Sequence, residues 1–453
     1  MKPRPPLPHG PFLVVGLARS GLAAALTLRA RGEEVIGCDA GSREEPHLRE
    51  ASERLSEAGV EVVLDASGDA LAARAGTLIK SPGVPTDAPA VVAARKRRLP
   101  VLGELELAWR LLPNEFLAVT GTNGKTTTTE WIGHVHRQAG APVAVAGNVG
   151  TAVSSLVGKV SLDDTIVCEV SSFQLEDSEA FAPEAAVLIN ISPDHLDRHE
   201  SFEAYVKAKL RIFRNQTGED VAVMPETLPG FLGQLALKPS AGKAQQVEFG
   251  RGAAAALREH DHRLWWRGEP LISVQDVSLP GAHNLQNAMA VASVCLARGL
   301  QAEAVVAGLK SFPGVAHRLE LVAQRDGVSY VNDSKATNVQ STLVALGAYE
   351  GGVHLIAGGR SKHQDFTPLA PLVAQRCRAV YLIGEAEAEL ATALERTEVP
   401  LRHEGDLERA VDAARAAAVP GDVVLLSPAC ASYDQYRNFE QRGEHFRTLV
   451  EAR

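Results

Sequence analysis

The sequence predicts an α/β protein of about three domains, each with a largely parallel sheet between helices. The chain of 453 residues is longer than one ordinary domain, and its length alone suggests roughly three. Short apolar segments alternate with helix-like segments along most of the chain, which is the pattern of doubly wound sheets. Several apolar segments are continuous, as expected for strands that helices cover on both faces.

The composition indicates a globular protein that acts on small ligands. Hydrophobic residues make up 45% of the chain and charged residues 22%, which suits packed cores. The formal net charge of −9 disfavours binding of nucleic acid but leaves local loops able to bind small anions. We therefore expect small-molecule substrates and no nucleic-acid partner. We also expect a monomer.

Cysteine usage and hydropathy predict a cytoplasmic location. Five cysteines are scattered without a Cys-x-x-Cys pair, so no zinc site or disulfide framework is expected. The N-terminal run Met-Lys-Pro-Arg-Pro-Pro-Leu-Pro lacks the apolar core of a signal peptide. No apolar segment is long enough to span a bilayer, so we expect no membrane contact.

The first predicted domain, residues 1–103, begins with a degenerate nucleotide-binding turn. Strands are expected over 12–16, 34–39 and 77–83, with a helix over 21–30. The run Gly16-Leu-Ala-Arg-Ser-Gly21 follows the first strand, and Asp39 ends the second. Backbone N–H groups of this turn would bind a diphosphate, and Asp39 a ribose or sugar hydroxyl. A tight turn without a ligand is an equal alternative, because the fingerprint is incomplete.

The second predicted domain, residues 104–311, contains a phosphate loop. An apolar strand over 116–119 leads into Thr-Gly-Thr-Asn-Gly-Lys125-Thr126-Thr and a helix-like stretch. The backbone N–H groups can cradle phosphate oxygens, Lys125 can reach the terminal phosphates and Thr126 can hold Mg²⁺. The general pattern has glycine where this chain has Val119, so a turn before an ordinary helix is the alternative. The strand–loop–helix context favours binding of ATP or GTP.

The same domain offers acids and histidines for a metal site. Glu169 ends a predicted strand, where its carboxylate can hold Mg²⁺ or be an ordinary exposed acid. The run Asp194-His195-Leu-Asp197-Arg-His199 combines groups that bind metal or move protons, and Pro193 places it in a loop. Further strands are expected over 142–146, 165–169 and 185–190, a small antiparallel sheet over 245–280, and helices over 284–299 and 302–311.

The third predicted domain, residues 312–453, has three polar strand ends. Strands are expected over 329–332, 353–357, 379–383 and 422–427, and polar runs follow three of them at 332–338, 358–362 and 427–439. Open α/β sheets bind ligands at the carboxyl ends of their strands. These runs therefore predict a site for a small polar ligand, with ordinary loops as the alternative.

Together, the motifs resemble those of the Mur ligases. The resemblance covers nearly the whole chain in order, and the shortened phosphate loop is the form of this family. The last two motifs are similar to those of the members that add D-glutamate. The motifs are Gly-Thr-Asn-Gly-Lys-Thr-Thr at 121–127, Asp-His-Leu-Asp at 194–197, Gly-Ala-His-Asn-Leu-Gln-Asn at 281–287, His317-Arg318, Asn-Asp-Ser-Lys-Ala-Thr-Asn at 332–338, and the run from Ser427 to Gly443.

The resemblance implies both a fold and a reaction. It implies a Rossmann-like UDP-binding domain, a P-loop ATPase-like central domain and a Rossmann-like C-terminal domain. The reaction would be the ATP-dependent addition of D-glutamate to UDP-N-acetylmuramoyl-L-alanine through an acyl phosphate, in cytoplasmic peptidoglycan precursor synthesis. The cofactors would be ATP and Mg²⁺ at two sites.

The resemblance also implies roles for individual residues. The UDP-linked substrate would contact Gly16, Arg19, Ser20, Gly21, Asp39, Ser81, Asn148 and His195. ATP would contact Gly121, Thr122, Asn123, Gly124, Lys125, Thr126, Thr127, Asn284, Asn287, Arg318 and Asp333. D-Glutamate would contact Thr337, Lys362, Ser432 and Phe439. The metal ligands would be Thr126, Glu169, His195 and Lys209, and the catalytic residues Lys125, Glu169, His195 and Lys209.

The resemblance changes the interpretation of one lysine. From the residues alone, Lys207, Lys209 and Arg211 on an amphipathic helix over 204–213 form a solvated face. Lys209 aligns with a lysine that CO₂ carbamylates in similar enzymes. The carbamate would convert a cation into the carboxylate that a Mg²⁺ site needs.

The sequence departs from the family motifs at two places, and three alternative functions stay open. Ala40-Gly41 lacks the Thr-Arg that often follows the acid in relatives, which bears on the uracil contacts. His363 is unusual beside Lys362, which bears on the loop near D-glutamate. The alternatives are ligation of another amino acid, an NAD-linked oxidoreductase that uses the turn at 16–21, and a nucleotide-switched binding module.

Overall fold

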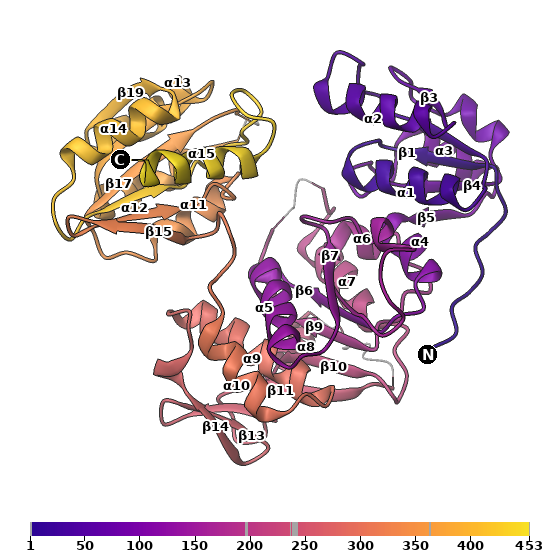
Figure 1. The fold of residues 1–453 in the computed structure, drawn as a ribbon, viewed down its shortest axis with the longest axis horizontal. Helices are drawn as coiled ribbons and strands as arrows, with labels where there is room; N and C mark the ends of the chain where they lie inside the picture. The colour runs from indigo at the N-terminus through magenta and orange to yellow at the C-terminus, as the bar shows by residue number, and fades with distance from the viewer. Residues whose placement is uncertain (1, 195–197, 236, 238–242, 362–363, 453) are drawn as a thin grey trace. The chain divides into compact units, whose positions relative to one another are not determined.

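The computed structural model describes residues 2–194, 198–235, 237, 243–361 and 364–452. The chain divides into two compact units, residues 1–313 and residues 314–453, and each unit is described by itself. The described residues form three sheets, of five, nine and six strands, with helices packed along them (Figure 1). Most neighbouring strands run parallel, which confirms the predicted α/β class.

The five-stranded sheet forms from the N-terminal part of the first unit. Its order is β3-β2-β1-β4-β5, and all neighbours are parallel. The sequence pattern does not predict β3 and β5, because three residues are too few to show a periodicity. The elements are β1 (Phe12–Val15), α1 (Arg19–Ala30), β2 (Val35–Cys38), α2 (Pro46–Glu57), β3 (Glu61–Val63), η1 (Ala70–Arg74), β4 (Thr77–Lys80), α3 (Pro89–Lys96) and β5 (Val101–Gly103).

The nine-stranded sheet has the order β14-β13-β12-β11-β10-β9-β6-β8-β7. The prediction of a small antiparallel sheet over 245–280 is only partly right, because β11 pairs parallel with β10 and so joins this segment to the large sheet. Only the pairs β12–β13 and β13–β14 are antiparallel. The strands are β6 (Phe116–Thr120), β7 (Val143–Gly147), β8 (Thr165–Glu169), β9 (Ala185–Leu188), β10 (Val221–Pro225), β11 (Gln245–Gly250), β12 (Leu257–His260), β13 (Arg263–Trp266) and β14 (Glu269–Ser273).

Helices cover this sheet and bury its apolar strands. Trp131 of α5 stacks on Phe312 with ring centroids 4.8 Å apart, and its Nε1 donates to the Gly308 carbonyl oxygen at 3.0 Å. This contact joins α5 to α10. The helical elements are α4 (Glu104–Leu111), α5 (Lys125–Gln138), η2 (Val153–Leu156), α6 (Ser172–Glu176), α7 (Phe202–Leu210), η3 (Arg211–Phe213), α8 (Leu228–Gln234), η4 (Val274–Asp276), α9 (Ala282–Ala297) and α10 (Ala302–Ser311).

The six-stranded sheet belongs to the second unit. Its order is β15-β16-β20-β17-β18-β19, and only β15 pairs antiparallel with its neighbour. The strands are β15 (Glu320–Arg325), β16 (Val328–Asn332), β17 (Val353–Gly358), β18 (Cys377–Ile383), β19 (Leu401–Gly405) and β20 (Val423–Leu426). The helical elements are α11 (Val339–Leu346), η5 (Thr367–Leu369), α12 (Ala370–Arg376), α13 (Glu387–Leu394), η6 (Glu395–Thr397), α14 (Leu407–Ala417) and α15 (Phe439–Glu451).

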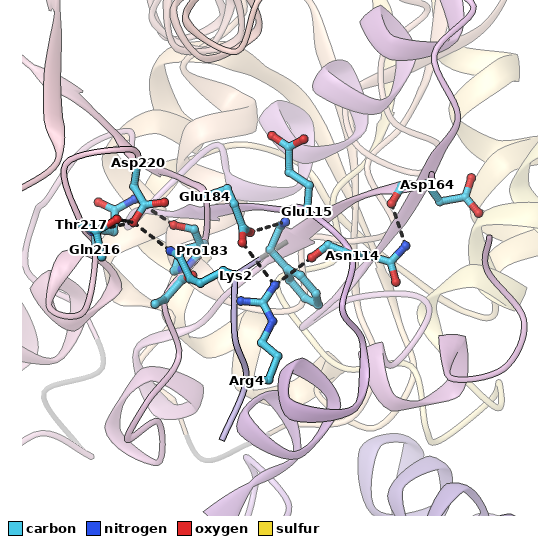
Figure 2. Close-up of polar contacts among 12 residues, drawn as sticks. Lys2, Arg4, Asn114, Glu115, Asp164, Pro183, Glu184, Gln216, Thr217 and Asp220 are labelled. Atoms are coloured by element: carbon cyan, nitrogen blue, oxygen red, sulfur yellow. Dashed lines mark hydrogen bonds and ion pairs between the residues drawn. The ribbon is translucent and has the colours of Figure 1, made fainter. Parts of the chain in front are cut away.

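The N-terminal segment contacts the nine-stranded sheet of the same unit before the chain enters β1. Lys2 Nζ donates to Asp220 Oδ2 at 2.8 Å, and Arg4 Nη2 donates to the Asn114 carbonyl oxygen at 2.8 Å and to Glu184 Oε1 at 3.3 Å. Figure 2 shows both cations pointing at these acceptors beside the amino ends of β6 and β9. The segment therefore ties the first sheet to the second.

A buried ion pair makes a second link within the first unit. Lys80, which ends β4, donates to Asp177 Oδ2 at 2.5 Å, and the two side chains are 1% and 5% exposed. Asp177 follows α6 on the central part of the unit. Among the described residues, no helix is both long and apolar enough to cross a membrane.

Candidate active site

The phosphate loop joins β6 to α5, which begins at Lys125. Gly124 has a φ of +81°, a conformation that favours glycine. A Cβ at this position would lie 2.3 Å from Asn287 Oδ1. The loop therefore needs glycine at 124 and packs against Asn287 of α9. This brings two of the predicted ATP residues together.

Lys125 lies over its own loop. Its Nζ donates to the carbonyl oxygens of Gly121 and Thr122 at 3.0 and 2.9 Å. Asn123 N donates to Asn190 Oδ1 at 2.9 Å, so a residue after β9 holds the tip of the loop. The ammonium and the start of α5 lie at one place, which is the arrangement that binds phosphate oxygens.

A hydroxyl and a carboxylate meet at the end of the loop. Thr126 Oγ1 donates to Glu169 Oε2 at 2.6 Å, and Asn148 Nδ2 donates to Glu169 Oε1 at 3.1 Å. Glu169 ends β8 and is 3% exposed, so the alternative of an ordinary exposed acid is wrong. The structure thus brings two predicted metal ligands and a predicted substrate residue together.

The donor chemistry of this pair fits Mg²⁺. Both groups are oxygen ligands, and Mg²⁺ is commonly held by one or two carboxylates together with phosphate oxygens and water. Among the described residues, no group of three or more His, Cys, Asp or Glu side chains is arranged to hold a metal ion. A protein-only cage is therefore not formed by this part of the chain, and substrate oxygens and water would supply the remaining ligands.

Lys209 is buried beside the phosphate loop. It is 2% exposed, and its Nζ donates to the Gly121 carbonyl oxygen at 2.7 Å. The ammonium also lies 4.7 Å from the centre of the Tyr205 ring. The prediction of a solvated face is therefore wrong for Lys209. It holds for Lys207, which is exposed and pairs with Glu203 at 2.7 Å.

Burial weakens the binding of the proton to the Lys209 side chain. Desolvation, followed by repulsion from Lys125, holds the pKa of the Lys209 ammonium well below its usual value. A lowered pKa raises the fraction of neutral amine at neutral pH. The neutral amine is the nucleophilic form of the side chain.

The predicted acid–histidine run lies only partly within the described residues. His195 and Asp197 lie outside them, so their predicted roles stay predictions. His199 is buried, and its Nε2 is 3.0 Å from Ser172 Oγ while its ring stacks on Phe173. These contacts give His199 a packing role against α6. Pro193 lies in a loop, as predicted.

Arg198 connects this run to the first sheet. Its guanidinium lies 4.5 Å from the Phe173 ring centre and donates to the Gly83 and Val84 carbonyl oxygens at 3.4 and 3.2 Å. Ser81, a predicted substrate residue, precedes these acceptors in the same turn. The turn after β4 and the run after β9 are therefore held together.

The residues of the predicted diphosphate-binding turn also lie close together. A Cβ at Gly16, which has a φ of +85°, would lie 2.9 Å from the Ser81 Cβ. A Cβ at Gly21 would lie 1.7 Å from the Gly16 carbonyl oxygen, so both glycines permit close approach of the backbone. Asp39 accepts hydrogen bonds from the N–H groups of Leu17 and Gly41 at 2.7 and 2.9 Å.

The remaining predicted residues of the first unit flank these groups. Arg19 is exposed and donates to the Gly150 carbonyl oxygen at 2.9 Å, and Ser20 is partly buried beside it at the start of α1. Asn284 donates to the Pro280 carbonyl oxygen at 2.8 Å at the start of α9. Thr127 is buried in the first turn of α5.

In the second unit, the predicted residues follow the carboxyl ends of strands. Asp333 follows β16 and is 5% exposed, and it accepts a hydrogen bond from Ser427 Oγ at 2.7 Å. Burial raises the pKa of the Asp333 carboxyl to about 7. Arg318 and Thr337 are partly buried, Ser432 is buried, and Phe439 begins α15. Lys362 lies outside the described residues.

The structure adds a residue of this region that the sequence analysis does not single out. Arg442 on α15 is 1% exposed and donates to backbone and hydroxyl oxygens of three loops. The only sequence signal is its place in the Asn-Phe-Glu-Gln-Arg-Gly run. A charged residue in a helix is solvated by default, and only the packing of α15 on the strand ends shows otherwise.

Comparison with known proteins supports the motif assignments. Residues 119–295 match the model of the Mur ligase middle domain, and residues 317–430 match the model of the Mur ligase, glutamate ligase domain. Two relatives are named "UDP-N-acetylmuramoylalanine--D-glutamate ligase". The one from Acidobacterium capsulatum is 45% identical over 97% of this chain and 96% of its own length. The one from Koribacter versatilis is 41% identical over the same shares.

Solved structures share the fold at low sequence identity. The UDP-N-acetylmuramate-alanine ligase MurC of Thermotoga maritima has a TM-score of 0.60 and 19% identity, covering 98% of this chain and all of that one. The MurF ligase of Thermotoga maritima in complex with ADP also has a TM-score of 0.60, with 17% identity, and covers 93% of this chain and 96% of that one. At this sequence identity, the structural similarity supports the fold alone.

Proposed function

The chain belongs to the Mur ligase family, and we propose that it adds D-glutamate to UDP-N-acetylmuramoyl-L-alanine with consumption of ATP. Curated relatives of 41–45% identity carry that activity in their name and match the chain over nearly its full length. The product would be an intermediate of peptidoglycan precursor synthesis. We place the reaction in the cytoplasm and expect a monomer.

The observation that carries the proposal is the grouping around the phosphate loop. Lys125 lies at the start of α5, Thr126 contacts the buried Glu169, and Lys209 contacts the loop carbonyl of Gly121. The arrangement suits a nucleotide triphosphate bound with Mg²⁺. Asn148, a predicted residue for the second substrate, shares the same carboxylate.

The residues of this grouping would act by position and charge. The substrate carboxylate and the terminal phosphate of ATP are both anions, so their approach is opposed by repulsion. Lys125 would offset part of that repulsion from the helix N-terminus. Thr126 and Glu169 would hold Mg²⁺, which when bound neutralises further negative charge. No residue of the protein needs to form a covalent bond with either substrate.

The amine of the acceptor must be neutral when it attacks the acyl phosphate. His195 is the side chain that we assign to help remove its proton, although it lies outside the described residues. Thr337, Ser432 and Phe439 in the second unit, together with Lys362, would bind the acceptor. Three polar strand ends in one unit support this assignment, because open α/β sheets bind ligands there.

Lys209 would complete the metal site as a carbamate. The neutral amine that its lowered pKa favours is the form that reacts with CO₂. A carbamate would replace a cation by an anionic oxygen ligand next to Glu169 and Lys125. The proposal is supported by the burial of Lys209 and by its contact with the phosphate loop.

The test is phosphate release from Mg-ATP with UDP-N-acetylmuramoyl-L-alanine and one acceptor at a time. The acceptors are D-glutamate, L-glutamate, glycine, L-alanine and meso-diaminopimelate. Release that depends on D-glutamate alone supports both the reaction and the acceptor. Release with another acceptor keeps the ligase and overturns the acceptor. Release without any acceptor favours a nucleotide-switched module, and reduction of NAD by the protein would favour an oxidoreductase.

A further inference from the structure

Three loops lie side by side at one edge of the six-stranded sheet. Strands β16, β20 and β17 are adjacent and parallel, so their carboxyl ends meet at the same edge. The loops that follow them carry Asp333 and Thr337, Gly359 and Arg360, and Ser432. Two of the proposed acceptor residues, Thr337 and Ser432, therefore lie on loops at the same edge of the sheet.

One guanidinium reaches all three loops. Arg442 Nε donates to Ser334 Oγ at 3.0 Å, and Nη2 donates to the Ser334 and Cys430 carbonyl oxygens at 2.9 and 3.1 Å. Nη1 donates to the carbonyl oxygens of Gly358 and Ala431 at 3.4 Å each. The five N–H donors of an arginine side chain are thus divided among the three strand ends.

Because the Arg442 guanidinium is buried, losing any of its hydrogen bonds would leave a donor of this charged group without a partner. Arg442 is 1% exposed, and each of these five hydrogen bonds goes to an uncharged oxygen. Burial lowers the pKa of its guanidinium to about 10, so the group stays charged at neutral pH. A buried charge is tolerated only when its donors are satisfied, so the guanidinium favours the arrangement in which all three loops are close.

The loops also contact one another directly beside Arg442. Arg360 N donates to the Ala431 carbonyl oxygen at 2.9 Å. A Cβ at Gly359 would lie 2.2 Å from the same oxygen and 3.1 Å from Arg442 Nη1. Ser334 Oγ, which accepts from Arg442 Nε, donates in turn to the Phe439 carbonyl oxygen at 2.8 Å. Small displacements of the guanidinium therefore reach both the glycine loop and the start of α15.

We propose that Arg442 is a positioning residue for the amino-acid acceptor, whose guanidinium sets the separation of the loops that carry Thr337 and Ser432. The inference rests on the proposed function for the identity of the acceptor. It adds a residue that need not touch the acceptor and acts through Ser334, Cys430 and Ala431. Lysine cannot take its place, because one ammonium lacks the planar fork that serves several acceptors at once.

The variant Arg442→Lys tests the proposal against Arg447→Lys as control. Arg447 lies on the same helix, but it is 28% exposed and pairs with Glu320 at 2.6 Å. Michaelis constants are measured separately for the acceptor, for ATP and for the UDP-linked substrate. Arg442→Lys should raise the Michaelis constant for the acceptor about tenfold, the effect of one lost charge-assisted hydrogen bond. That for the UDP-linked substrate, whose proposed residues lie in the other unit, should stay within twofold.

Hydrogen exchange supplies a readout that needs no substrate. In Arg442→Lys, amide exchange should become at least about tenfold faster over 333–338, 358–361 and 429–432 together, and stay unchanged in the interior strands β18 and β20. Loss of turnover with all Michaelis constants unchanged, or unchanged exchange in the three loops, would overturn the positioning role. The wild-type acceptor assay decides the proposed function separately, and the acceptor that it identifies is the one used for the variants.

Discussion

Thr126 Oγ1 donates a hydrogen bond to Glu169 Oε2 at 2.6 Å, which joins the first turn of α5 to the end of β8. The contact sets the carboxylate of a buried strand beside the phosphate loop. It gives the proposed Mg²⁺ two oxygen ligands from distant parts of the sequence. The first prediction concerns this pair.

Glu169→Gln should lower phosphate release by at least about a hundredfold and raise the Mg²⁺ concentration needed for half-maximal activity. An amide keeps the size of the side chain and can still accept from Thr126, but it removes the negative charge that Mg²⁺ prefers. The measurement is phosphate release over a Mg²⁺ titration. Asp163→Asn is the control, because Asp163 is an exposed acid just before the same strand. An unchanged Mg²⁺ requirement in Glu169→Gln would contradict the proposed metal site.

Lys209→Ala should abolish turnover, and short carboxylic acids such as formate or acetate should restore part of it. An added carboxylate would take the place of the proposed carbamate beside the phosphate loop. Lys207→Ala is the matched control, because Lys207 lies on the same helix with its side chain 59% exposed. The measurement is phosphate release in the presence of D-glutamate. Full activity of Lys209→Ala would remove both the carbamate and any catalytic role for this lysine.

The features that local sequence determines could be predicted. The strand, glycine loop and helix at 116–138 form one continuous segment, so the composition of that segment predicts its shape. The same holds for the turn after β1, where Gly16 and Gly21 permit close backbone approach. In both cases the residues that make the geometry are neighbours in the chain.

The features that depend on packing between distant segments could not be predicted from residues alone. Lys209 and Lys207 are two residues apart on α7, but Lys209 is buried against the phosphate loop and the Tyr205 ring, whereas Lys207 is exposed. Arg442 is buried because α15 packs on three strand ends. Strand β11 joins the large sheet by pairing with β10. The residues of β10 lie outside the segment 245–280, so the pattern of that segment could not predict the pairing.

Arg4→Ala should lower the free energy of unfolding of the first unit by about 3 kcal/mol, as expected when one partner of a buried ion pair is removed. The guanidinium side chain is 6% exposed and donates to Glu184 (Figure 2), and it lies 4.2 Å from the Trp109 ring centre. The variant loses both contacts, and among the residues that the structure describes Glu184 then keeps the Phe116 N–H at 2.8 Å. All four tryptophans lie within residues 1–313, so tryptophan fluorescence during urea unfolding reports this unit.

The control for this prediction is Arg74→Ala, which removes an exposed ion pair with Glu61 from the same unit. Exposed pairs contribute little to stability, so this variant should unfold at the wild-type urea concentration. Equal unfolding midpoints for Arg4→Ala and wild type would show that the N-terminal segment does not tie the two sheets together.

Asp333→Asn should make the second unit less sensitive to alkaline pH. Burial raises the pKa of Asp333 to about 7, while Ser427, Arg318 and Lys335 favour its charged form. The carboxyl of the unfolded chain has a pKa of about 3.9. The protonated Asp333 therefore stabilises the folded unit fully below about pH 4, and this stabilisation is lost as the pH rises through about 7. From pH 5 to pH 8, the free energy of unfolding of Asp333→Asn should therefore rise by about 2 kcal/mol relative to wild type.

The pH comparison is made by hydrogen exchange of the β16 and β20 amides, which lie in the same unit as Asp333. Asp326→Asn is the control, because Asp326 is exposed in the turn between β15 and β16. This variant should behave like the wild type at each pH, because the Asp326 side chain is exposed. A constant difference for Asp333→Asn as well would mean that Asp333 is ionised in the folded protein at pH 5. In that case Ser427 and Arg318 would outweigh the cost of burying the charge.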